Sequence, residues 1–402
     1  MRHILMNQNT PIMAIEYNTT LNAIEEIYET YHIDHAPLSI LNASKIKGAN
    51  LLKQVNEWFK GRGIPSWRKD LENLLEKLNV SSPEELLNKS YALSLSDQYW
   101  LKEENSIVKW QDINFFNNDF QYEAYLEAAL DSSSNLNAST DKAILRSPNN
   151  TTDGMLQKGW IIEQGKRVLV KGTYTFSREE PFNEWLASQI SKRLGFDYCN
   201  YWVSWSDKTK LVSKCENFIS ENEEIISAYD IFKSEKKPNN LSDYEFYIKI
   251  LEQHNVLNAR ENVANMFIVD YLMMNTDRHL KNFGIIRNVN TLEWVRTTPI
   301  FDTGQSMQCD RYLNEMDFSY GTGKFFTNTA KDYEDILKTI GSYITTLDIK
   351  KLEGLCDEYK TMLEQYQDKQ DISDKRIEKL TSGLKERIEK LEANIEMLKL
   401  NK

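Results

Sequence analysis

The sequence is poor in cysteine, and the few cysteines it has follow no functional pattern. They are Cys199, Cys215, Cys309 and Cys356, which lie far apart and form no CxxC pair. This spacing argues against a disulfide framework and against a zinc site, so we expect reduced thiols.

Long hydrophobic runs are also missing. The most apolar stretch, residues 266–274, is too short to span a bilayer and contains Asp270. The N-terminal residues lack an apolar core of signal-peptide length. Both absences predict a cytoplasmic protein.

An excess of positive charge is the third absence. Forty-nine basic residues against sixty acidic residues give a net charge of -11. A field of this sign repels phosphate backbones and acidic membranes, so we expect neither direct nucleic-acid binding nor membrane binding. With 402 residues, 41% of them hydrophobic, the chain can build a globular core of two or three domains.

The first third of the sequence reads as a mainly helical accessory region, residues 1–135. Residues 1–17 alternate as two short strands, whereas residues 21–33, 49–64 and 66–93 have helical spacing. The segment 131–154 is rich in Ser and Asn and predicts the boundary to the next region.

Beyond this boundary the hydrophobic period changes to that of strands. Residues 160–172 predict a hairpin about Gln164 and Gly165, and residues 181–195 predict a helix. A second strand pair follows, and residues 259–274 predict a buried helix. We therefore expect an α+β protein with a strand-rich region, 145–218, followed by a helical region, 219–368.

The last residues, 370–402, carry a heptad pattern. Ile377, Leu384, Leu391 and Leu398 recur every seven positions, with Ile388 and Ile395 between them. This seam predicts either a coiled coil, which would self-associate or bind a partner through Leu384, Ile388, Leu391 and Ile395, or one amphipathic helix that packs on its own domain.

Chemistry is concentrated in the segment "NTDRHLKNFG", residues 275–284. Asp277 and Asn282 lie five residues apart, and Asp302 follows in "FDTG" after a predicted strand, turn and strand. Phosphoryl transfer needs such a carboxylate to accept a hydroxyl proton, and Mg²⁺ prefers oxygen ligands such as the other two side chains offer. His279 and Lys281 would then donate hydrogen bonds to phosphate oxygens.

Each of these features has an ordinary structural explanation when it is taken alone. Asp277 could cap a helix, and Asp302 could belong to a simple turn. Their order favours a kinase, because Lys171 ends a predicted strand and Glu184 opens the next helix, as a nucleotide-binding lysine and its partner do. Gly154 lies in a polar loop ahead of the hairpin, where backbone N–H groups could cover phosphates.

The segments "NTDRHLKNFG", "FDTG", "VLVKG", "FNEW" and "TTDGMLQKGW" together resemble the HipA-like family of bacterial serine/threonine kinases over residues 145–330. The resemblance implies a two-lobed kinase fold that binds ATP between its lobes. Asp277 would be the catalytic base, with His279 and Lys281 beside it, and Asn282 and Asp302 would hold Mg²⁺. Residues implied for nucleotide binding are Gly154, Lys158, Lys171, Glu184, Glu216, Phe218 and His279. The family also phosphorylates its own glycine loop, for which the candidates here are Thr151, Thr152 and Ser147.

Two other functions remain open at this level. The catalytic loop is also similar to that of phosphatidylinositol kinases, which leaves a lipid or small-molecule kinase as an alternative. A binding module that keeps the fold without the chemistry is another. The resemblance leaves an antitoxin-like regulator open as a partner, and the protein substrate is not encoded in the sequence.

Overall fold

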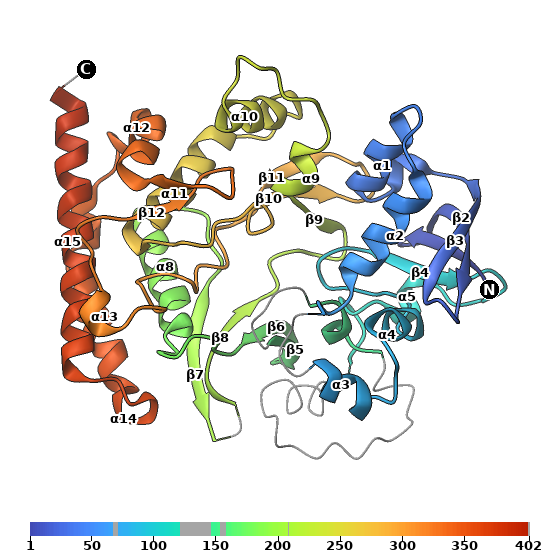
Figure 1. Ribbon diagram of the computed structural model, residues 1–402, viewed down its shortest axis with the longest axis horizontal. Coiled ribbons are helices and arrows are strands. Elements are labelled where there is room, and N and C mark those ends of the chain that lie inside the picture. The colour runs from blue at the N-terminus through green and yellow to red at the C-terminus, as the bar shows by residue number, and fades with distance from the viewer. Residues whose placement is uncertain (67–70, 121–145, 153–157, 208, 401–402) are drawn as a thin grey trace.

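The structure is a computed structural model that describes residues 1–66, 71–120, 146–152, 158–207 and 209–400 (Figure 1). In this part of the chain, helices are combined with four sheets whose paired strands are all antiparallel. The expected mixture of helix and sheet is confirmed. Within the same residues, no helix has both the length and the apolar character needed to cross a membrane.

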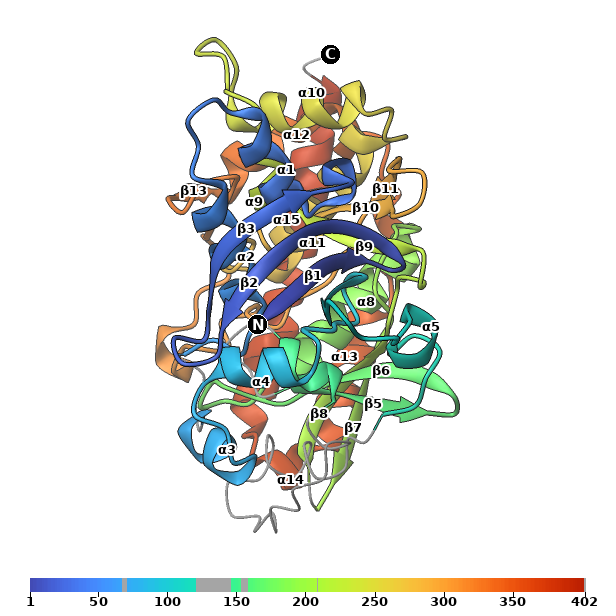
Figure 2. The same cartoon turned by 90° about the vertical axis from the view of Figure 1, so that its right-hand side faces the viewer.

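A four-stranded sheet organises the N-terminal region (Figure 2), in the order β3-β2-β1-β4. Its strands are β1 (Arg2–Asn7), β2 (Thr10–Asn18), β3 (Ala23–Thr30) and β4 (Tyr99–Glu103). The helices of this region are α1 (Leu38–Lys45), α2 (Leu51–Arg62), α3 (Leu71–Lys77), α4 (Pro83–Lys89) and α5 (Trp110–Ile113). Within the described residues, the helices predicted over 49–64 and 66–93 and the two strands predicted in residues 1–17 are confirmed, but the helix predicted over 21–33 is wrong.

Most of this segment, Ala23–Thr30, forms β3 instead. Ile24 and Ile27 are three residues apart, which mimics helical spacing, yet Ile27 pairs with Ile15 and Ile24 with Tyr17. The register shifts twice between β2 and β3, so extra residues of β3 bulge out of the ladder. Such bulges interrupt the two-residue alternation by which a strand is recognised.

The strand-rich region forms a second four-stranded sheet, in the order β5-β6-β8-β7. Its elements are β5 (Lys158–Glu163), β6 (Lys166–Lys171), α8 (Glu180–Leu194), β7 (Tyr201–Ser206) and β8 (Lys210–Glu216). The predicted hairpin is confirmed, and its turn residues Gln164 and Gly165 have φ angles of 51° and 77°. Gly195 ends α8 with a φ of 80°, as the sequence predicted.

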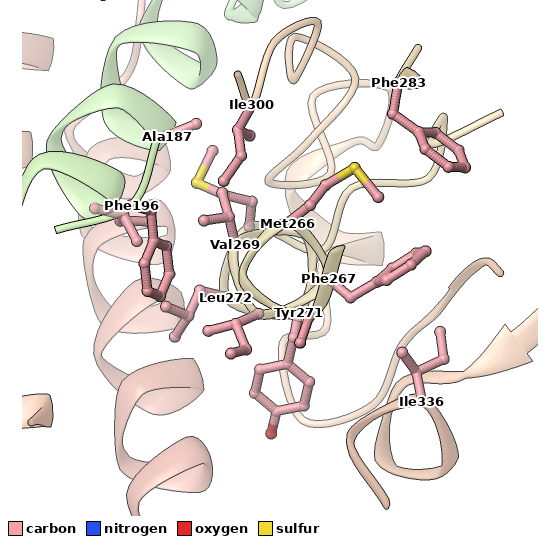
Figure 3. Close-up of a cluster of buried hydrophobic side chains, with 14 of the residues drawn as sticks. Ala187, Phe196, Met266, Phe267, Val269, Tyr271, Leu272, Phe283, Ile300 and Ile336 are labelled. Atoms are coloured by element: carbon pink, nitrogen blue, oxygen red, sulfur yellow. The ribbon is translucent and has the colours of Figure 1, made fainter. Parts of the chain in front are cut away.

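The remaining residues are mostly helical. The helices are α9 (Ala228–Phe232), α10 (Asp243–Gln253), α11 (Ala259–Met273), α12 (Tyr333–Ile344), α13 (Leu355–Gln365), α14 (Gln367–Gln370) and α15 (Asp374–Leu400). Short strands accompany them: β9 (Glu223–Ser227), β10 (Gly284–Asn288), β11 (Trp294–Thr297), β12 (Thr322–Lys324) and β13 (Ala330–Asp332). Figure 3 looks along α11 and shows apolar side chains on all of its sides, which confirms the predicted buried helix.

The C-terminal helix α15 runs along one side of the molecule, next to α12 and α13 (Figure 1). Leu384, Leu391 and Ile395 are at most 3% exposed and belong to the main core, against which Ile388 and Leu398 also pack. The packed-helix alternative is therefore correct. Self-association through this seam loses its basis, because the chain's own core already covers these side chains.

The N-terminal region is fixed to the rest of the chain by buried polar contacts. Arg287 of β10 forms an ion pair with Glu224 of β9, with 2.6 Å between Nε and Oε1. The same guanidinium donates to Tyr99 Oη and to the Ala36 carbonyl oxygen of the N-terminal region. The predicted boundary at 131–154 lies mostly outside the described residues.

Candidate active site

The centre of the candidate site is a buried lysine between two carboxylates. Lys171 ends β6, and its Nζ contacts Glu184 Oε1 of α8 and lies 2.6 Å from Asp302 Oδ1. Ser213 of β8 donates to the second oxygen of Glu184. Lys171 and Glu184 are 3% and 1% exposed, so water hardly reaches the pair. A strand, a helix and a distant loop therefore converge on one ammonium group.

Lys171, Glu184 and Asp302 influence one another's protonation states. Burial opposes a charged Lys171, but Asp302 and Glu184 outweigh it and raise the pKa of the ammonium. Burial would raise the pKa of the Asp302 carboxyl, yet Lys171 and Lys158 hold it below its usual value. Burial raises the pKa of Glu184. At neutral pH the site thus holds a cationic Lys171 beside an anionic Asp302.

The loop after α11 is braced by Arg278, which is 1% exposed. Its guanidinium donates hydrogen bonds to both carboxylate oxygens of Asp270, at 2.8 and 2.9 Å. It also donates to the carbonyl oxygens of Asn282 and Phe301, both at 2.7 Å. The planar fork of arginine suits such paired acceptors. Arg278 thereby ties the end of α11 to the loop and to the segment that carries Asp302.

Asp277 and Asn282 occupy this braced loop. Asn282 Nδ2 donates to the Asp277 carbonyl oxygen at 3.0 Å, which holds the two residues together. Asp277 Oδ1 lies 2.7 Å from Lys324 Nζ of β12, and Oδ2 lies 3.8 Å from His279 Nε2. Burial lowers the pKa of His279, so its imidazole is neutral at pH 7 and donates as a neutral group.

A cavity of about 790 Å³ collects most of the predicted residues. Those that line it are Thr151, Thr152, Lys158, Asp277, His279, Lys281, Asn282 and Asp302. These residues come from the segment ahead of β5, from β5 itself, from the loop after α11 and from the loop after β11. A cavity of this size accommodates a small-molecule ligand such as a nucleotide.

Three of the predicted residues lie elsewhere in the described part of the chain. Glu216 points to Lys166 in a mostly exposed ion pair, and Phe218 packs against Phe301 with 5.6 Å between ring centres. Ser147 is fully buried and accepts from the Asn149 amide at 3.3 Å. Gly154 lies outside the described residues.

The two candidate hydroxyls at the cavity are already hydrogen-bonded. Thr151 Oγ1 donates to the carbonyl oxygens of Leu93 and Pro148 at 3.0 and 3.1 Å. Thr152 Oγ1 donates to the Asn149 carbonyl oxygen at 3.0 Å. Leu93 belongs to the N-terminal region, so that region contacts the loop ahead of β5 directly.

Sequence reasoning missed several residues of the site. Lys324 pairs with Asp277 from 47 residues downstream, in a short strand without a motif. Ser94 and Ser96 bring the N-terminal region into the cavity wall. Asp270 was noted only as a charge within an apolar helix; that exception in a buried helix was a signal for a partner such as Arg278.

The residues present fit a magnesium ion. Asp302 supplies an anionic carboxylate, and Asn282 donates through its nitrogen, which leaves its amide oxygen for a cation. Both side chains line the same cavity. One carboxylate and one further oxygen from the protein, with phosphate and water in the other positions, is the usual arrangement for Mg²⁺.

Comparison with known proteins points to one family. The family model described as the HipA-like C-terminal domain matches residues 140–369. Over 153 residues, the chain is 28% identical to serine/threonine-protein kinase CtkA of Helicobacter pylori, a match that covers 34% of this chain and 45% of CtkA. The chain thus spans less than half the length of this curated relative.

One solved structure, that of a HipA protein, supports the fold. HipA of Shewanella oneidensis MR-1, solved with HipB and operator DNA, covers 97% of both chains at 13% identity with a TM-score of 0.52. The crystal structure of the Helicobacter pylori proinflammatory kinase CtkA covers 60% of this chain and 94% of that chain, at 19% identity with a TM-score of 0.48. The similarity to HipA extends through the N-terminal region.

Proposed function

We propose, on the premise that the chain belongs to the HipA-like C-terminal domain family, that it is a two-lobed, ATP- and Mg²⁺-dependent kinase of serine and threonine hydroxyls in proteins. One observation carries this proposal. The buried residues Lys171 and Glu184 form one ion-pair network with Asp302, here called the lysine network. Asp302 lines the same cavity as Asp277 and Asn282. A scaffold protein has no need of this combination.

Nucleotide binding is assigned to the lysine network. Glu184 holds the Lys171 ammonium in place, and this ammonium is assigned to the α- and β-phosphates. Lys158, His279 and Lys281 line the same cavity and are donors for phosphate oxygens. The neutral His279 donates one hydrogen bond without adding charge.

Metal binding is assigned to Asp302 and Asn282, through one carboxylate and one amide oxygen. When bound, the metal neutralises charge that develops on the β- and γ-phosphates. The Lys171 contact keeps Asp302 anionic, which is the form that binds a cation. The left-handed φ of 56° at Asp302 is a conformation that tertiary contacts must hold in place.

Proton transfer is assigned to Asp277. The substrate hydroxyl oxygen bonds to the γ-phosphorus, the bond from that phosphorus to the β–γ bridging oxygen breaks, and ADP leaves. The hydroxyl proton passes to the Asp277 carboxylate. Lys324, whose Nζ lies 2.7 Å from Oδ1, orients this carboxylate.

The proposal extends to control of the enzyme. Thr151 is the first candidate for self-phosphorylation because its side chain is at the cavity, whereas Ser147 is buried. The Shewanella relative was solved with HipB, so an antitoxin-like partner is part of the proposal as well.

The test is direct. The purified chain is incubated with Mg²⁺ and γ-labelled ATP, alone and with a cell lysate, beside an Asp277→Asn control. Label on a protein band that depends on Mg²⁺ and is lost in the control supports the proposal. Absence of label on protein, combined with label on lipids or small metabolites, would favour the alternative kinase class.

A further inference from the structure

A second buried ion pair lies at the start of α8, the helix that carries Glu184. Glu179 precedes this helix, is fully buried, and makes no capping hydrogen bond to it. Its carboxylate instead receives both sides of the Arg376 guanidinium, with 2.8 Å between Nη2 and Oε2 and a second contact from Nε. Arg376 lies in the first turn of α15 and is 9% exposed. The first turn of the C-terminal helix α15 is thus bound to the start of α8.

The first turns of α8 contact the segments that follow Lys171 and Asp302. Glu180 Oε1 accepts from the backbone N–H groups of Tyr174 and Thr175, just after the strand that ends in Lys171. Asn183 Nδ2 donates to the carbonyl oxygens of Gly304 and Ser306, both at 2.8 Å, just after Asp302. The first turns of α8 therefore contact both loops that carry the lysine network.

Arg376 also reaches the segment that follows Asp302. Its Nη1 donates to the Arg311 carbonyl oxygen at 2.9 Å. Ser177, two residues before Glu179, donates to the Cys309 carbonyl oxygen at 2.6 Å. One guanidinium therefore connects the start of α8 with the loop that leaves the metal-binding position.

We propose that Arg376 is a positioning residue for phosphoryl transfer, which holds α8 through Glu179 so that Glu184 meets Lys171 and Asp302. This inference rests on the proposed kinase function and adds to it a role for the C-terminal helix. The Arg376–Glu179 pair spans 197 residues of sequence and joins the C-terminal helix to the start of the helix that carries Glu184.

The type of residue supports positioning rather than plain stability. A buried arginine–carboxylate pair often stabilises a protein less than apolar side chains of similar volume would, because both charges lose their hydration. Its advantage is geometric, because the planar fork fixes two oxygens in one orientation. Helix α8 must keep a fixed orientation if Glu184 is to stay within contact distance of Lys171.

The test uses the full chain with point variants, because truncation would also remove core side chains of α15. Arg376→Ala removes the pair from one side, and the isosteric Glu179→Gln removes its negative charge and one of its two acceptor oxygens from the other. Arg376→Lys keeps the charge without the fork. Arg193→Ala is the matched control. Arg193 lies near the other end of the same helix and pairs with Glu358 of α13 at 2.6 Å, away from the lysine network.

Two readouts are measured well below the melting temperature of each variant. The first is the single-turnover rate of phosphate transfer, and the second is hydrogen exchange of peptides from residues 180–190. We expect the rate to fall at least about tenfold in Arg376→Ala and Glu179→Gln, since small displacements of catalytic groups are costly. Exchange should become faster in the first turns of α8, and Arg193→Ala should change neither readout.

The outcomes separate this inference from the kinase proposal. Wild-type rate and wild-type exchange in both pair-breaking variants would overturn the role of Arg376. A wild-type protein that transfers no phosphate would reject the kinase proposal, and the exchange measurement would still decide whether Arg376 holds α8. If Arg376→Ala does not fold, Glu179→Gln and Arg376→Lys decide the question on the same criteria.

Discussion

Lys171 Nζ and Asp302 Oδ1 lie 2.6 Å apart although 131 residues separate them in the sequence. The lysine comes from the end of β6, and the aspartate comes from the loop after β11. Their contact joins the strand-rich sheet to the loops of the helical region. A ligand that replaces or shares this contact therefore changes the contacts of both the strand-rich sheet and the helical region.

Removal of the Asp302 carboxylate should abolish Mg²⁺-dependent nucleotide binding. In Asp302→Ala the proposed metal loses its only charged protein ligand, and Lys171 keeps Glu184 alone. Isothermal titration calorimetry with MgATP should show at least about a tenfold weaker affinity, which corresponds to about 1.4 kcal/mol of binding free energy. Asp310→Ala, an exposed aspartate in the same segment, is the control. Equal MgATP affinity in Asp302→Ala and wild type would refute the metal assignment.

Loss of the Arg278 brace should destabilise the fold. Arg278→Ala leaves the buried Asp270 carboxylate without its cationic partner, and breaking a buried ion pair in this way costs about 3–5 kcal/mol. Urea unfolding measures the free energy directly. Arg260→Ala breaks a half-exposed pair with Glu245 and should cost about 0.2–1 kcal/mol. Similar costs for the two variants would show that the brace is unimportant.

A substitution at Gly383 tests whether α15 packs against the core of its own chain. A Cβ at this position would lie 2.3 Å from the Phe318 ring, so Gly383→Ala should destabilise the protein by about 1–3 kcal/mol. Gly61 lies inside α2, where a Cβ meets nothing within 4 Å. Gly61→Ala should stabilise the helix by up to about 1 kcal/mol. A gain in melting temperature for Gly383→Ala would mean that α15 does not pack on Phe318 in solution.

Self-phosphorylation should modify Thr151 and switch the enzyme off. A phosphate removes the hydroxyl proton that is donated to the Leu93 carbonyl oxygen, and it adds about -1.5 to -2 charges beside a triphosphate site. Intact-mass spectrometry after incubation with MgATP should show one added phosphate in wild type and none in Thr151→Ala. Two results count against this switch: no phosphate between Ser147 and Lys158, or a phosphorylated form that binds ATP as tightly as the unmodified one.

Local patterns in the sequence were sufficient for the elements around the site. The hairpin at Gln164 and Gly165, the cap at Gly195 and the buried helix α11 were all predictable, because turn chemistry and hydrophobic period act over a few residues. The bulged strand β3 was not, because its pairing with β2 overrides a spacing that also suits a helix. Local pattern therefore fails where tertiary pairing sets the spacing.

Long-range partners mark the other limit. The heptad positions of α15 revealed an apolar face but not what covers it, since a seam of three heptads fits a partner or its own core equally well. The Asp277–Lys324 and Glu179–Arg376 pairs have no sequence signature. Such pairs depend on where the fold places two distant side chains, and only the structure brings them together.

The central claim is that Asp277 accepts the hydroxyl proton in a phosphoryl transfer, and Asp277→Asn tests it most directly. This variant keeps the size of the side chain and removes its basicity, while Lys171, Asn282 and Asp302 stay unchanged. Single-turnover transfer of labelled phosphate from MgATP should fall by about 10²–10⁴-fold, with MgATP affinity within about twofold of wild type. Undiminished transfer in this variant would contradict the account.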